Sequence, residues 1–367
     1  MKVLVTGAGG FIGRNLLLTL AHQHPEIKPL PYEADAAPGT LERLIGDCDF
    51  VVHLAGINRP KDASEYETGN LGFTDALCAA LERAGSRAPV LMTSSTQAEL
   101  DNPYGRSKRA AEERLREHEA RTGAQALIYR LPNVFGKLCR PNYNSAVATF
   151  CHNIARDLPV TVTDPAIQLS LVYIDDVVAE IVRAIRGNPS PDRAVAPVHR
   201  ATLGQIVALL RGFRASRSTL ELPDVGDPFS RKLHATYLSY LPEGERAYPL
   251  TAHRDARGSF TEFARTGERG QVSVNVSKPG IVKGNHFHHT KHEKFLVVWG
   301  EGVIRLRRVG EDAVDEYHVR GDAPVVVDIP PGFTHNIENR GAGDMVTVMW
   351  ASECFDPQNP DTYALEV

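Results

Sequence analysis

The sequence is poor in cysteine, and its cysteines form none of the paired motifs that hold metals or redox disulfides. An odd, scattered set of thiols is typical of a reducing compartment, where cysteines stay free. The five thiols belong to Cys48, Cys78, Cys139, Cys151 and Cys354. We therefore expect free cysteines and exclude the small disulfide-rich class of protein.

The sequence also lacks a long apolar run and a large excess of one charge. Its apolar start, "MKVLV", runs directly into a glycine loop, with no basic region or cleavage site of a signal peptide. No run approaches the roughly 20 apolar residues of a membrane span. Lys and Arg number 41 against 45 Asp and Glu, a net charge of −4, which argues against nucleic-acid or anionic-membrane partners. We expect a cytoplasmic protein.

The chain has the length and the patterns of two domains. Its 367 residues exceed what one core comfortably serves. Up to about residue 213, β-branched runs such as "KVLVT" alternate with helical patterns, which predicts an α/β doubly wound parallel sheet. Beyond about residue 250, short strands such as "GQVSVNVSKPG" are separated by Gly, Pro and Asp turns, which predicts an antiparallel barrel or sandwich. We place the domains at residues 1–243 and 244–367.

A glycine loop separates the first expected strand from the first expected helix. The stretch "VTGAGGFIG" contains Gly7, Gly10 and Gly13. Glycines let the backbone turn tightly and approach a pyrophosphate, whose charge then lies at the helix N-terminus. The loop therefore predicts a dinucleotide site.

Further motifs follow this loop in order, namely "HLAG", "MTSS", "YGRSK" and "YRLPNVFG". Together they resemble the extended short-chain dehydrogenase/reductase family. The resemblance implies a Rossmann-like domain in which Tyr104, Lys108, Ser95 and Asn70 act in catalysis and Asn133 contacts substrate. The cofactor contacts it implies come from Tyr104 and Lys108 and from Gly7, Gly10, Phe11, Ile12, Gly13, Arg14, Leu54, Ala55 and Gly56.

The chemistry of ketone reduction explains the tyrosine–lysine pair. Reduction needs a hydride on carbon and a proton on oxygen. A tyrosine, with an ordinary pKa of about 10, can donate that proton when an ammonium group lies nearby. Lys108 lies one helical turn from Tyr104 and can supply it, Ser95 would bond the substrate oxygen, and Asn70 would hold a relay water. The short interval before Tyr104 leaves Ser94 and Thr96 as alternatives for the serine role.

The choice between NADPH and NADH stays open in the sequence. The second expected strand ends "KPLPYEAD", and an acidic residue there, Glu33 or Asp35, favours the free 2′-hydroxyl of NAD. Arg14, just past the last glycine of the loop, could instead neutralise the 2′-phosphate of NADP.

The stretch "GIVKGNHFHHTKHEKFLVVWG" is rich in histidine. On a strand, His286 and His288 point to the same face because they are two residues apart. Glu293 begins the next apolar strand, and "PPGFTHNIEN" supplies His335 much later. Three imidazoles and a carboxylate suit a divalent transition metal, with zinc expected and iron or manganese as alternatives.

This spacing resembles the signature of the cupin family, a jelly-roll barrel. The family pattern is met at Gly280, His286, His288, Glu293, Gly300, Pro330, Gly332, His335 and Asn339, while Pro324 stands in place of one glycine. His289 and His292 lie outside it, and we expect His289 to be structural. The stretch "RDARGSF" resembles the opening of nucleotide-sugar 3,5-epimerases, which implies that Arg257 contacts nucleotide phosphates.

Over nearly its whole length the chain resembles the bifunctional CapF-type (WbjC-type) capsular-polysaccharide enzymes, in stretches such as "DNPYGRSK", "RGSFTEF" and "FDPQNPDTY". The resemblance implies C3 epimerisation of a UDP-2-acetamido-2,6-dideoxy-hexos-4-ulose in the cupin. Reduction at C4 by NADPH, or by NADH as the alternative, would then give a UDP-2-acetamido-2,6-dideoxy-L-talose on the route to UDP-N-acetyl-L-fucosamine. This order agrees with chemistry, because a C–H bond is acidic beside a ketone and not beside an alcohol.

The remaining expectations concern the base and the assembly. Lys283, beside the ligand strand, is the candidate base, with Tyr317 as a proton partner. We expect a UDP-activated 4-keto-6-deoxy amino sugar as substrate and a homodimer. Three alternatives stay open: a cupin that only dimerises the chain or binds metal, an epimerase or dehydratase that retains its NAD, and an iron oxygenase.

Overall fold

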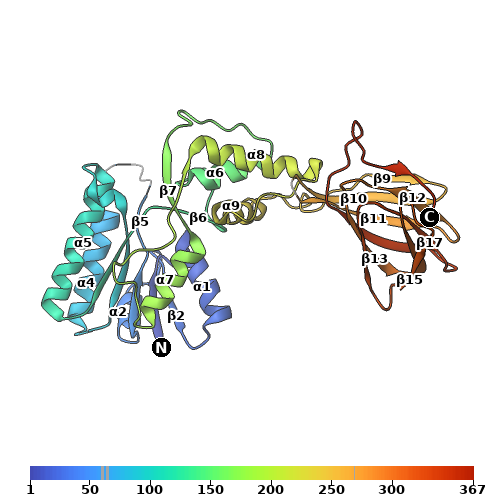
Figure 1. Ribbon diagram of the computed structural model, residues 1–367. Coiled ribbons are helices and arrows are strands. Elements are labelled where there is room, and N and C mark those ends of the chain that lie inside the picture. The colour runs from blue at the N-terminus through green and yellow to red at the C-terminus, as the bar shows by residue number, and fades with distance from the viewer. Residues whose placement is uncertain (59–61, 63–65, 268) are drawn as a thin grey trace. The chain divides into compact units, whose positions relative to one another are not determined.

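The computed structural model describes residues 1–58, 62, 66–267 and 269–367 (Figure 1). These residues divide into two units. The first contains residues 1–211 and 225–243, and the second contains residues 212–224 and 244–367.

A parallel sheet in the order β2-β1-β3-β4-β5 is the centre of the first unit. Its strands are β1 (Lys2–Thr6), β2 (Lys28–Tyr32), β3 (Phe50–His53), β4 (Val90–Ser95) and β5 (Ala126–Leu131). Helices cover both faces because each inner strand is apolar on both sides. In β1, Val3 and Val5 join one core and Leu4 joins the other. The predicted doubly wound α/β fold is confirmed.

The two cores are formed by different helices. One face packs against α1 (Phe11–Gln23) and α7 (Ile174–Ile185), and the other against α2 (Thr40–Ile45), α4 (Phe73–Arg83) and α5 (Pro103–Thr122). The remaining elements of this unit are η1 (Glu67–Gly72), η2 (Thr96–Glu99), β6 (Asn133–Phe135), α6 (Ala146–Ile154), β7 (Gln168–Tyr173), β8 (His199–Thr202) and α9 (Pro228–Ser239). Strands β6, β7 and β8 form a small separate sheet.

The strand order reverses direction between β1 and β3. From β1 the chain crosses through α1 to β2 on one side, and then returns to β3 on the other side of β1. Ligands of open α/β sheets bind at such a switch point, outside the carboxyl ends of the strands. The glycine loop follows β1 there, and the "HLAG" stretch follows β3.

The second unit is built from two antiparallel sheets, and this confirms the predicted all-β domain. One sheet has the order β16-β13-β18-β11-β10-β9 and the other β15-β14-β17-β12-β19. The strands are β9 (Ala252–Asp255), β10 (Gly258–Thr266), β11 (Gly270–Ser277), β12 (Val282–Phe287), β13 (Glu293–Trp299), β14 (Glu301–Arg308), β15 (Val314–Arg320), β16 (Val326–Ile329), β17 (Phe333–Asn339), β18 (Met345–Ala351) and β19 (Tyr363–Ala364). Alternate residues of β11 are buried, as expected for a strand with one face toward a core.

Residues 212–224 belong to the second unit although they precede the predicted boundary at residue 243. They include the end of α8 (Leu203–Thr219) and an extended segment beside β10. The amide of Leu222 donates to the carbonyl of Arg265, and the amide of Arg265 donates to the carbonyl of Leu220, each at 2.7 Å. Strand-like pairing, which links residues more than 40 positions apart, therefore assigns this segment to the second unit.

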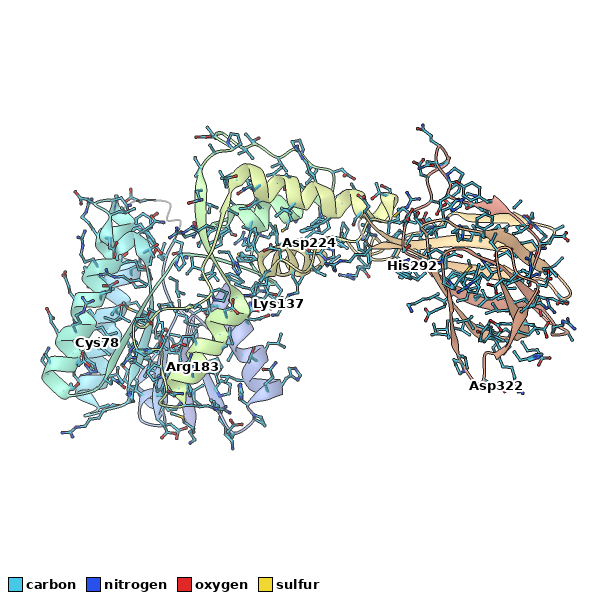
Figure 2. All side chains as sticks on the ribbon, in the orientation of Figure 1. Cys78, Lys137, Arg183, Asp224, His292 and Asp322 are labelled. Atoms are coloured by element: carbon cyan, nitrogen blue, oxygen red, sulfur yellow. The ribbon has the colours of Figure 1, made fainter. Side chains whose placement is uncertain are left out.

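Two smaller observations concern cysteines and helices. The five cysteines are free, and Cys78 is fully buried in α4 (Figure 2). Among the described helices, none combines the length and the apolar character that crossing a bilayer requires.

Candidate active sites

A cavity of about 900 Å³ lies at the switch point of the parallel sheet. The glycine loop and the ends of β3, β4 and β5 line it. Of the predicted cofactor and catalytic residues, the lining includes Gly7, Gly10, Phe11, Ile12, Gly13, Arg14, Leu54, Gly56, Ser95, Tyr104 and Lys108, together with the predicted substrate residue Asn133. Ala55 and Asn70 are not among the lining residues.

The loop fits a dinucleotide because its glycines allow close backbone contacts. A Cβ atom at Gly13 would lie 2.4 Å from the carbonyl oxygen of Gly7 and 2.5 Å from that of Ala8. Any side chain there would separate α1 from the loop. The loop therefore keeps the backbone donors at the start of α1 beside the cavity, where a pyrophosphate would bind.

Helix α5 carries the tyrosine and the lysine into this cavity. Asn102 caps the helix, since its side chain accepts a hydrogen bond of 2.7 Å from the amide of Gly105, and Pro103 begins the first turn. A Cβ atom at Gly105 would lie 2.2 Å from the carbonyl oxygen of Gln97 in η2. The absence of that atom lets α5 approach the end of β4, where Ser95 is located.

Ser95 and Tyr104 contact each other at the carboxyl end of β4. Burial raises the pKa of Tyr104, and the hydrogen bond to Ser95 partly opposes this shift. The ring of Tyr104 also packs against the ring of Tyr66, with 5.6 Å between their centroids. The phenol is therefore protonated at neutral pH and can act as an acid.

Lys108 lies one turn further along α5 and is only 8% exposed. Burial lowers the pKa of its ammonium group to about 8, although Glu112 partly offsets that effect. Its Nζ atom donates to the carbonyl oxygen of Thr93 at 3.3 Å. The group is therefore charged at neutral pH, close to its titration range.

Ser94, the alternative to Ser95, also lines the cavity, but its hydroxyl is bonded away from Tyr104. Ser94 donates a hydrogen bond of 2.5 Å to the fully buried carboxylate of Glu112, which also accepts from Arg130. Because neighbouring residues of a strand face opposite sides, Ser95 faces Tyr104 while Ser94 holds α5 against β4. Thr96 lines the cavity without a described contact to Tyr104.

Asn70 lies in η1, directly behind Gly56. Its side chain accepts from the amide of Ile57 at 2.9 Å and donates to the hydroxyl of Ser107 at 3.0 Å. A Cβ atom at Gly56 would lie 2.9 Å from its Oδ1 atom and 3.2 Å from Nζ of Lys108. Asn70 thus supports the wall on which Lys108 lies, and this structure gives the predicted relay role no direct contact with the cavity.

The far wall of the cavity contains residues that the sequence analysis did not assign. They are Lys137, Cys139, Arg140, Tyr143 and Tyr240, of which Lys137 is labelled in Figure 2. Arg140 lies over the ring of Tyr143, 5.5 Å from its centroid. Four of these residues lie in the irregular segment between β6 and α6, and Tyr240 follows α9. Neither place has a periodic pattern that could have predicted these residues.

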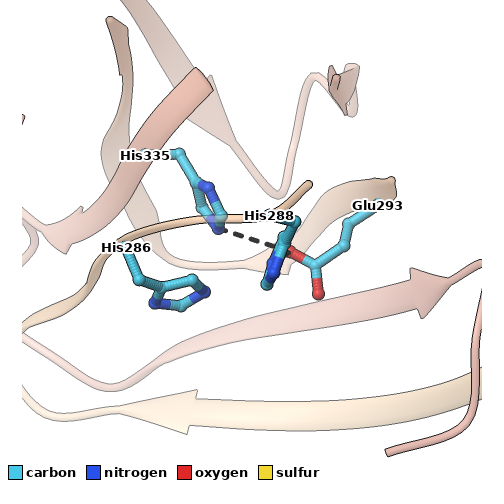
Figure 3. A group of neighbouring side chains, drawn as sticks. All are labelled: His286, His288, Glu293 and His335. Carbon is cyan, nitrogen blue, oxygen red and sulfur yellow. Dashed lines mark ion pairs between the residues drawn. The ribbon is translucent and has the colours of Figure 1, made fainter. Parts of the chain in front are cut away.

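The predicted metal ligands converge between the two sheets of the second unit (Figure 3). His286 and His288 belong to β12 and its end, and His335 to β17 of the same sheet, while Glu293 begins β13 of the other. One potential ligand atom of each of these four residues lies within 4.8 Å of the others. The four side chains that spacing predicted are therefore one group.

The chemistry of this group fits a divalent metal. His288, Glu293 and His335 are at most 9% exposed. Glu293 Oε2 lies 3.4 Å from His288 Nε2 and 3.3 Å from His335 Nε2, yet among the residues that the structure describes neither Glu293 Oε2 nor His288 Nε2 has a hydrogen-bond partner. Buried polar atoms without partners are rare and need an explanation. A cation held by all four residues would supply it.

Burial and neighbouring charges prepare these groups as ligands. Burial, with the nearby His335 and His288, lowers the pKa of His286 to about 4. Burial alone would raise the pKa of Glu293, but His288 and His335 outweigh it and lower that pKa. The group therefore contains a neutral imidazole and a carboxylate at neutral pH, which are the forms that bind metals.

The C-terminal segment orients one of the ligands. Nδ1 of His288 donates to the carbonyl oxygen of Asp361 at 2.6 Å, which leaves Nε2 free to bind a metal. The carboxylate of Asp361 accepts from the amides of His289, Thr290 and Lys291, each at 3.0 Å. One residue near the end of the chain thus fixes both the ring and the turn that follows it.

The other two histidines of the run lie outside the group. The ring of His289 packs against Tyr363, with 4.7 Å between centroids. The ring of His292, labelled in Figure 2, packs against Trp350 at 5.4 Å. Both therefore make surface packing contacts.

A second hollow, of about 280 Å³, lies beside the metal group's strand and contains Lys283 and Arg257. Lys283 Nζ donates to Asn275 Oδ1 at 2.6 Å and to the carbonyl of Val276 at 2.9 Å, and burial lowers its pKa. Arg257 pairs with Asp255 at 2.6 Å. The remaining lining residues are His253, Arg254, Ser259 and Phe260.

A β-bulge sets the direction of the Lys283 side chain. Lys283 is opposite Ile337 and His286 is opposite His335, so the register shifts between Gly284 and His286. Residues directly opposite each other share a face. Lys283 and His286, three positions apart, therefore point to the same inner side.

Tyr317 does not join these residues. It lies on β15, at the edge of the sheet, with β14 and β17 between it and β12. Three strand spacings correspond to roughly 14 Å, and the side chain is 40% exposed. The structure therefore places the predicted proton partner away from the metal ligands.

Comparisons with known proteins agree with this arrangement. A model of the NAD dependent epimerase/dehydratase family matches residues 3–195, and a model of the polysaccharide biosynthesis C-terminal domain matches residues 253–363. Fold and site thus define a Rossmann-type nucleotide-dependent enzyme domain followed by a polysaccharide-biosynthesis domain.

Full-length relatives refine this class. UDP-2-acetamido-2,6-beta-L-arabino-hexul-4-ose reductase of Pseudomonas aeruginosa is 46% identical and spans 100% of this chain and 99% of its own. The crystal structure of capsular polysaccharide assembling protein CapF from Staphylococcus aureus is 50% identical, with a TM-score of 0.95 and full coverage of both chains. CapF with the inhibitor 3-isopropenyl-tropolone is 46% identical, with a TM-score of 0.90 over both full chains. The chain belongs to the CapF-type (WbjC-type) family of capsular-polysaccharide sugar enzymes.

Proposed function

We propose that the chain is a bifunctional UDP-sugar enzyme. The second unit epimerises C3 of a UDP-2-acetamido-2,6-dideoxy-hexos-4-ulose, and the first then reduces C4 to give a UDP-2-acetamido-2,6-dideoxy-L-talose. The observation that carries the proposal is the presence of a separate, chemically complete residue group in each unit: Ser95, Tyr104 and Lys108 in one, and His286, His288, Glu293 and His335 in the other. The reductase activity of the Pseudomonas aeruginosa relative supports the second step.

In the reductase step, bound NAD(P)H supplies the hydride. Ser95 hydrogen-bonds the substrate oxygen, and Tyr104 gives it a proton. The ammonium of Lys108 stabilises the phenolate that remains, which makes proton release easier. Groups of this kind each contribute about 10²- to 10⁴-fold to a rate.

In the epimerisation step, a metal held by His286, His288, Glu293 and His335 would supply Lewis-acid polarisation of the 4-keto oxygen. Lys283 is the proposed base that removes the C3 proton, because the bulge turns it to the side of the metal ligands and burial lowers its pKa. Solvent water then returns a proton to the opposite face of C3 and takes up the proton held by Lys283, so that the step is balanced. Arg257, in the same hollow, is proposed to contact the phosphates of the substrate. The tropolone inhibitor of CapF supports a metal in this family, since the adjacent oxygens of tropolone chelate metals.

The decisive experiment is proton NMR of the enzyme with the UDP-4-keto sugar in heavy water and no nicotinamide. We expect the C3 proton signal to disappear. His335→Ala should abolish this exchange, while the matched His289→Ala, a histidine outside the ligand group, should retain it. Calorimetry, through the unfolding transition of the second unit, verifies that both variants are folded.

A second pair of variants isolates the reductase. Tyr104→Phe should retain C3 exchange and lose about 10²- to 10⁴-fold in oxidation of reduced cofactor, while Tyr66→Phe should retain both. If the C3 proton persists in the unmodified enzyme while reduced cofactor is still consumed, the second unit is a scaffold and the epimerase half of the proposal fails. The homodimer and the cytoplasmic location stay predictions.

A further inference from the structure

The side chain of Lys283 crosses the space between the two sheets of the second unit. Lys283 belongs to β12 of one sheet, and Asn275 and Val276 belong to β11 of the other. The lysine Nζ atom donates to Oδ1 of Asn275 at 2.6 Å and to the carbonyl oxygen of Val276 at 2.9 Å. Asn275 is only 6% exposed, so water competes little for its amide oxygen. Two neighbouring acceptors on the opposite sheet therefore hold the lysine nitrogen.

The second acceptor is accessible because residue 258 is a glycine. A Cβ atom at Gly258 would lie 1.9 Å from the carbonyl oxygen of Val276, so any side chain there would displace the carbonyl that receives Lys283. Gly258 also has a φ of 134°, which residues with a Cβ atom rarely adopt. The glycine of the "RGSF" stretch thus preserves one of the two bonds to the lysine.

The charged groups that face the lysine have both signs. His253, Arg254, Asp255 and Arg257 line the same hollow, from β9 and the turn that follows it. Burial lowers the pKa of Lys283, Asp255 opposes this effect and Arg257 adds to it. The neutral amine, the form that can accept a proton, is therefore easier to reach than in water.

The two acceptors also limit how the neutral amine can be oriented. A charged lysine has three N–H donors, and loss of one proton leaves two N–H bonds and a lone pair. Because both N–H bonds are then directed at Asn275 and Val276, tetrahedral geometry leaves a single direction for the lone pair. A lysine without these acceptors would instead rotate freely about its last bond.

We infer that Asn275 is a positioning residue of the epimerase site, which together with the Val276 carbonyl presents the lone pair of Lys283 to the C3 proton of the sugar. The inference rests on the proposed epimerisation and explains how its base is oriented. When the C3–H bond breaks, its electron pair enters the enolate and the proton forms the third N–H bond of Lys283. Both acceptors stay bonded throughout, so the lysine does not have to move.

The first test follows C3 proton exchange by the full-length enzyme in heavy water at a series of pD values. Asn275→Asp keeps an acceptor in place and adds a negative charge, which favours the ammonium. The rise of the exchange rate should therefore move about one to three pH units upward, with the rate at its alkaline end retained. Asn275→Leu keeps the approximate volume and removes the acceptor, so the rise should move downward and the rate at its alkaline end should fall about 10- to 100-fold.

The second test needs neither sugar nor metal. It measures the rate at which acetic anhydride acetylates Lys283 as a function of pH, by mass spectrometry of the peptide. The midpoint should rise in Asn275→Asp and fall in Asn275→Leu. Ser273→Ala, two residues earlier on the same buried face of β11, should match the unmodified protein in both tests. Calorimetry, through the unfolding transition of the second unit, verifies that the variants are folded.

The outcomes separate this inference from the proposed epimerisation. Exchange and acetylation profiles that coincide in all variants would overturn the inference and leave the epimerase intact. So would a loss of rate in both Asn275 variants without opposite displacements, since a residue that only supports the fold would behave in this way. If the unmodified enzyme shows no C3 exchange, the proposed epimerisation fails, and the inference fails with it.

Discussion

Lys108 is the residue whose environment most directly predicts a pH effect. Burial lowers its pKa from 10.5 to about 8 in the free enzyme. In the proposed reductase step the charged form assists Tyr104, and this form is lost as the pH rises through this value. We expect kcat/KM for the reduced cofactor, which reports the free enzyme, to be level below pH 8 and to fall tenfold per pH unit above it.

A matched variant identifies the titrating group. Lys108→Arg carries a charge that persists to much higher pH, so the fall near pH 8 should disappear from whatever activity remains. A fall that persists in this variant would show that another group titrates. The measurement is the pH profile of both proteins at fixed ionic strength.

At this scale the sequence predicts identities well and side-chain directions poorly. The common face of His286 and His288, two of the proposed metal ligands, was predictable because two-residue spacing on a strand fixes it. The serine was not, because Ser94 and Ser95 are adjacent and only the pairing of Ser94 with Glu112 shows which one faces the cavity. Cys139, Arg140 and Tyr143 belong to an irregular segment, where no period relates sequence to direction.

Among the helices and strands, α5 is the one whose N-terminal turn contains a proposed catalytic residue, Tyr104. Asn102→Ala removes the cap of its first turn, which contains Tyr104. We expect a loss of about 1 kcal/mol in the free energy of unfolding and a lower kcat for reduction, measured by thermal melting and cofactor oxidation. Asp227→Ala removes the equivalent cap of α9, a bond of 2.7 Å to the amide of Ser230.

Asp227→Ala is the control because its helix end does not carry a catalytic residue. It should lose similar stability and keep its kcat. Equal kcat values in the two variants would mean that the first turn of α5 does not depend on its cap.

The C-terminal segment gives a second prediction at this scale, because Asp361 holds the turn that follows His288. Asp361→Ala removes the acceptor for the turn after His288 and should weaken zinc binding about 10- to 100-fold, as measured by competition with a chromophoric chelator. Asp356→Ala, in the same segment, removes only a local contact with Gln358 and should bind zinc normally. Unchanged affinity in Asp361→Ala would show that His288 keeps its orientation without this support.

Helices and strands were predictable over most of the chain from the pattern of apolar residues. Apolar residues alternate with polar ones in half-buried strands and form continuous runs in fully buried strands. The bulge in β12 was not predictable. Its extra residue follows from the partner strand, which lies about fifty positions away in the sequence.

For the whole molecule, the two units predict two unfolding transitions. If the His and Glu group binds zinc as proposed, zinc would stabilise only the second unit, by about 2.7 kcal/mol at a hundredfold excess over its Kd. We therefore expect calorimetry with and without zinc to shift one transition and leave the other in place. A single transition, or equal shifts of both, would contradict independent unfolding.

The order of the two folds was predictable from the change in pattern near residue 250, but the path of the chain between them was not. Residues 212–224 contain the end of α8, a helix that begins in the first unit, and then pair with β10 of the second unit. Turn-forming residues there gave no indication of a partner, because pairing with a distant strand depends on the folded structure and not on local propensity.

The bulge at residues 284–286 also has a consequence for which changes the second site can accept. Asn285, with a φ of 57°, is the one residue that lets Lys283 and His286 share a face. A substitution that forces residue 285 into ordinary strand conformation would remove the bulge without shortening the chain, so that Lys283 and His286, three positions apart, would point to opposite sides although both were still present. Deletion of Asn285 would instead leave these two residues two positions apart and on one face, so the site should accept the loss of this residue more readily than a β-branched residue that resists its positive φ.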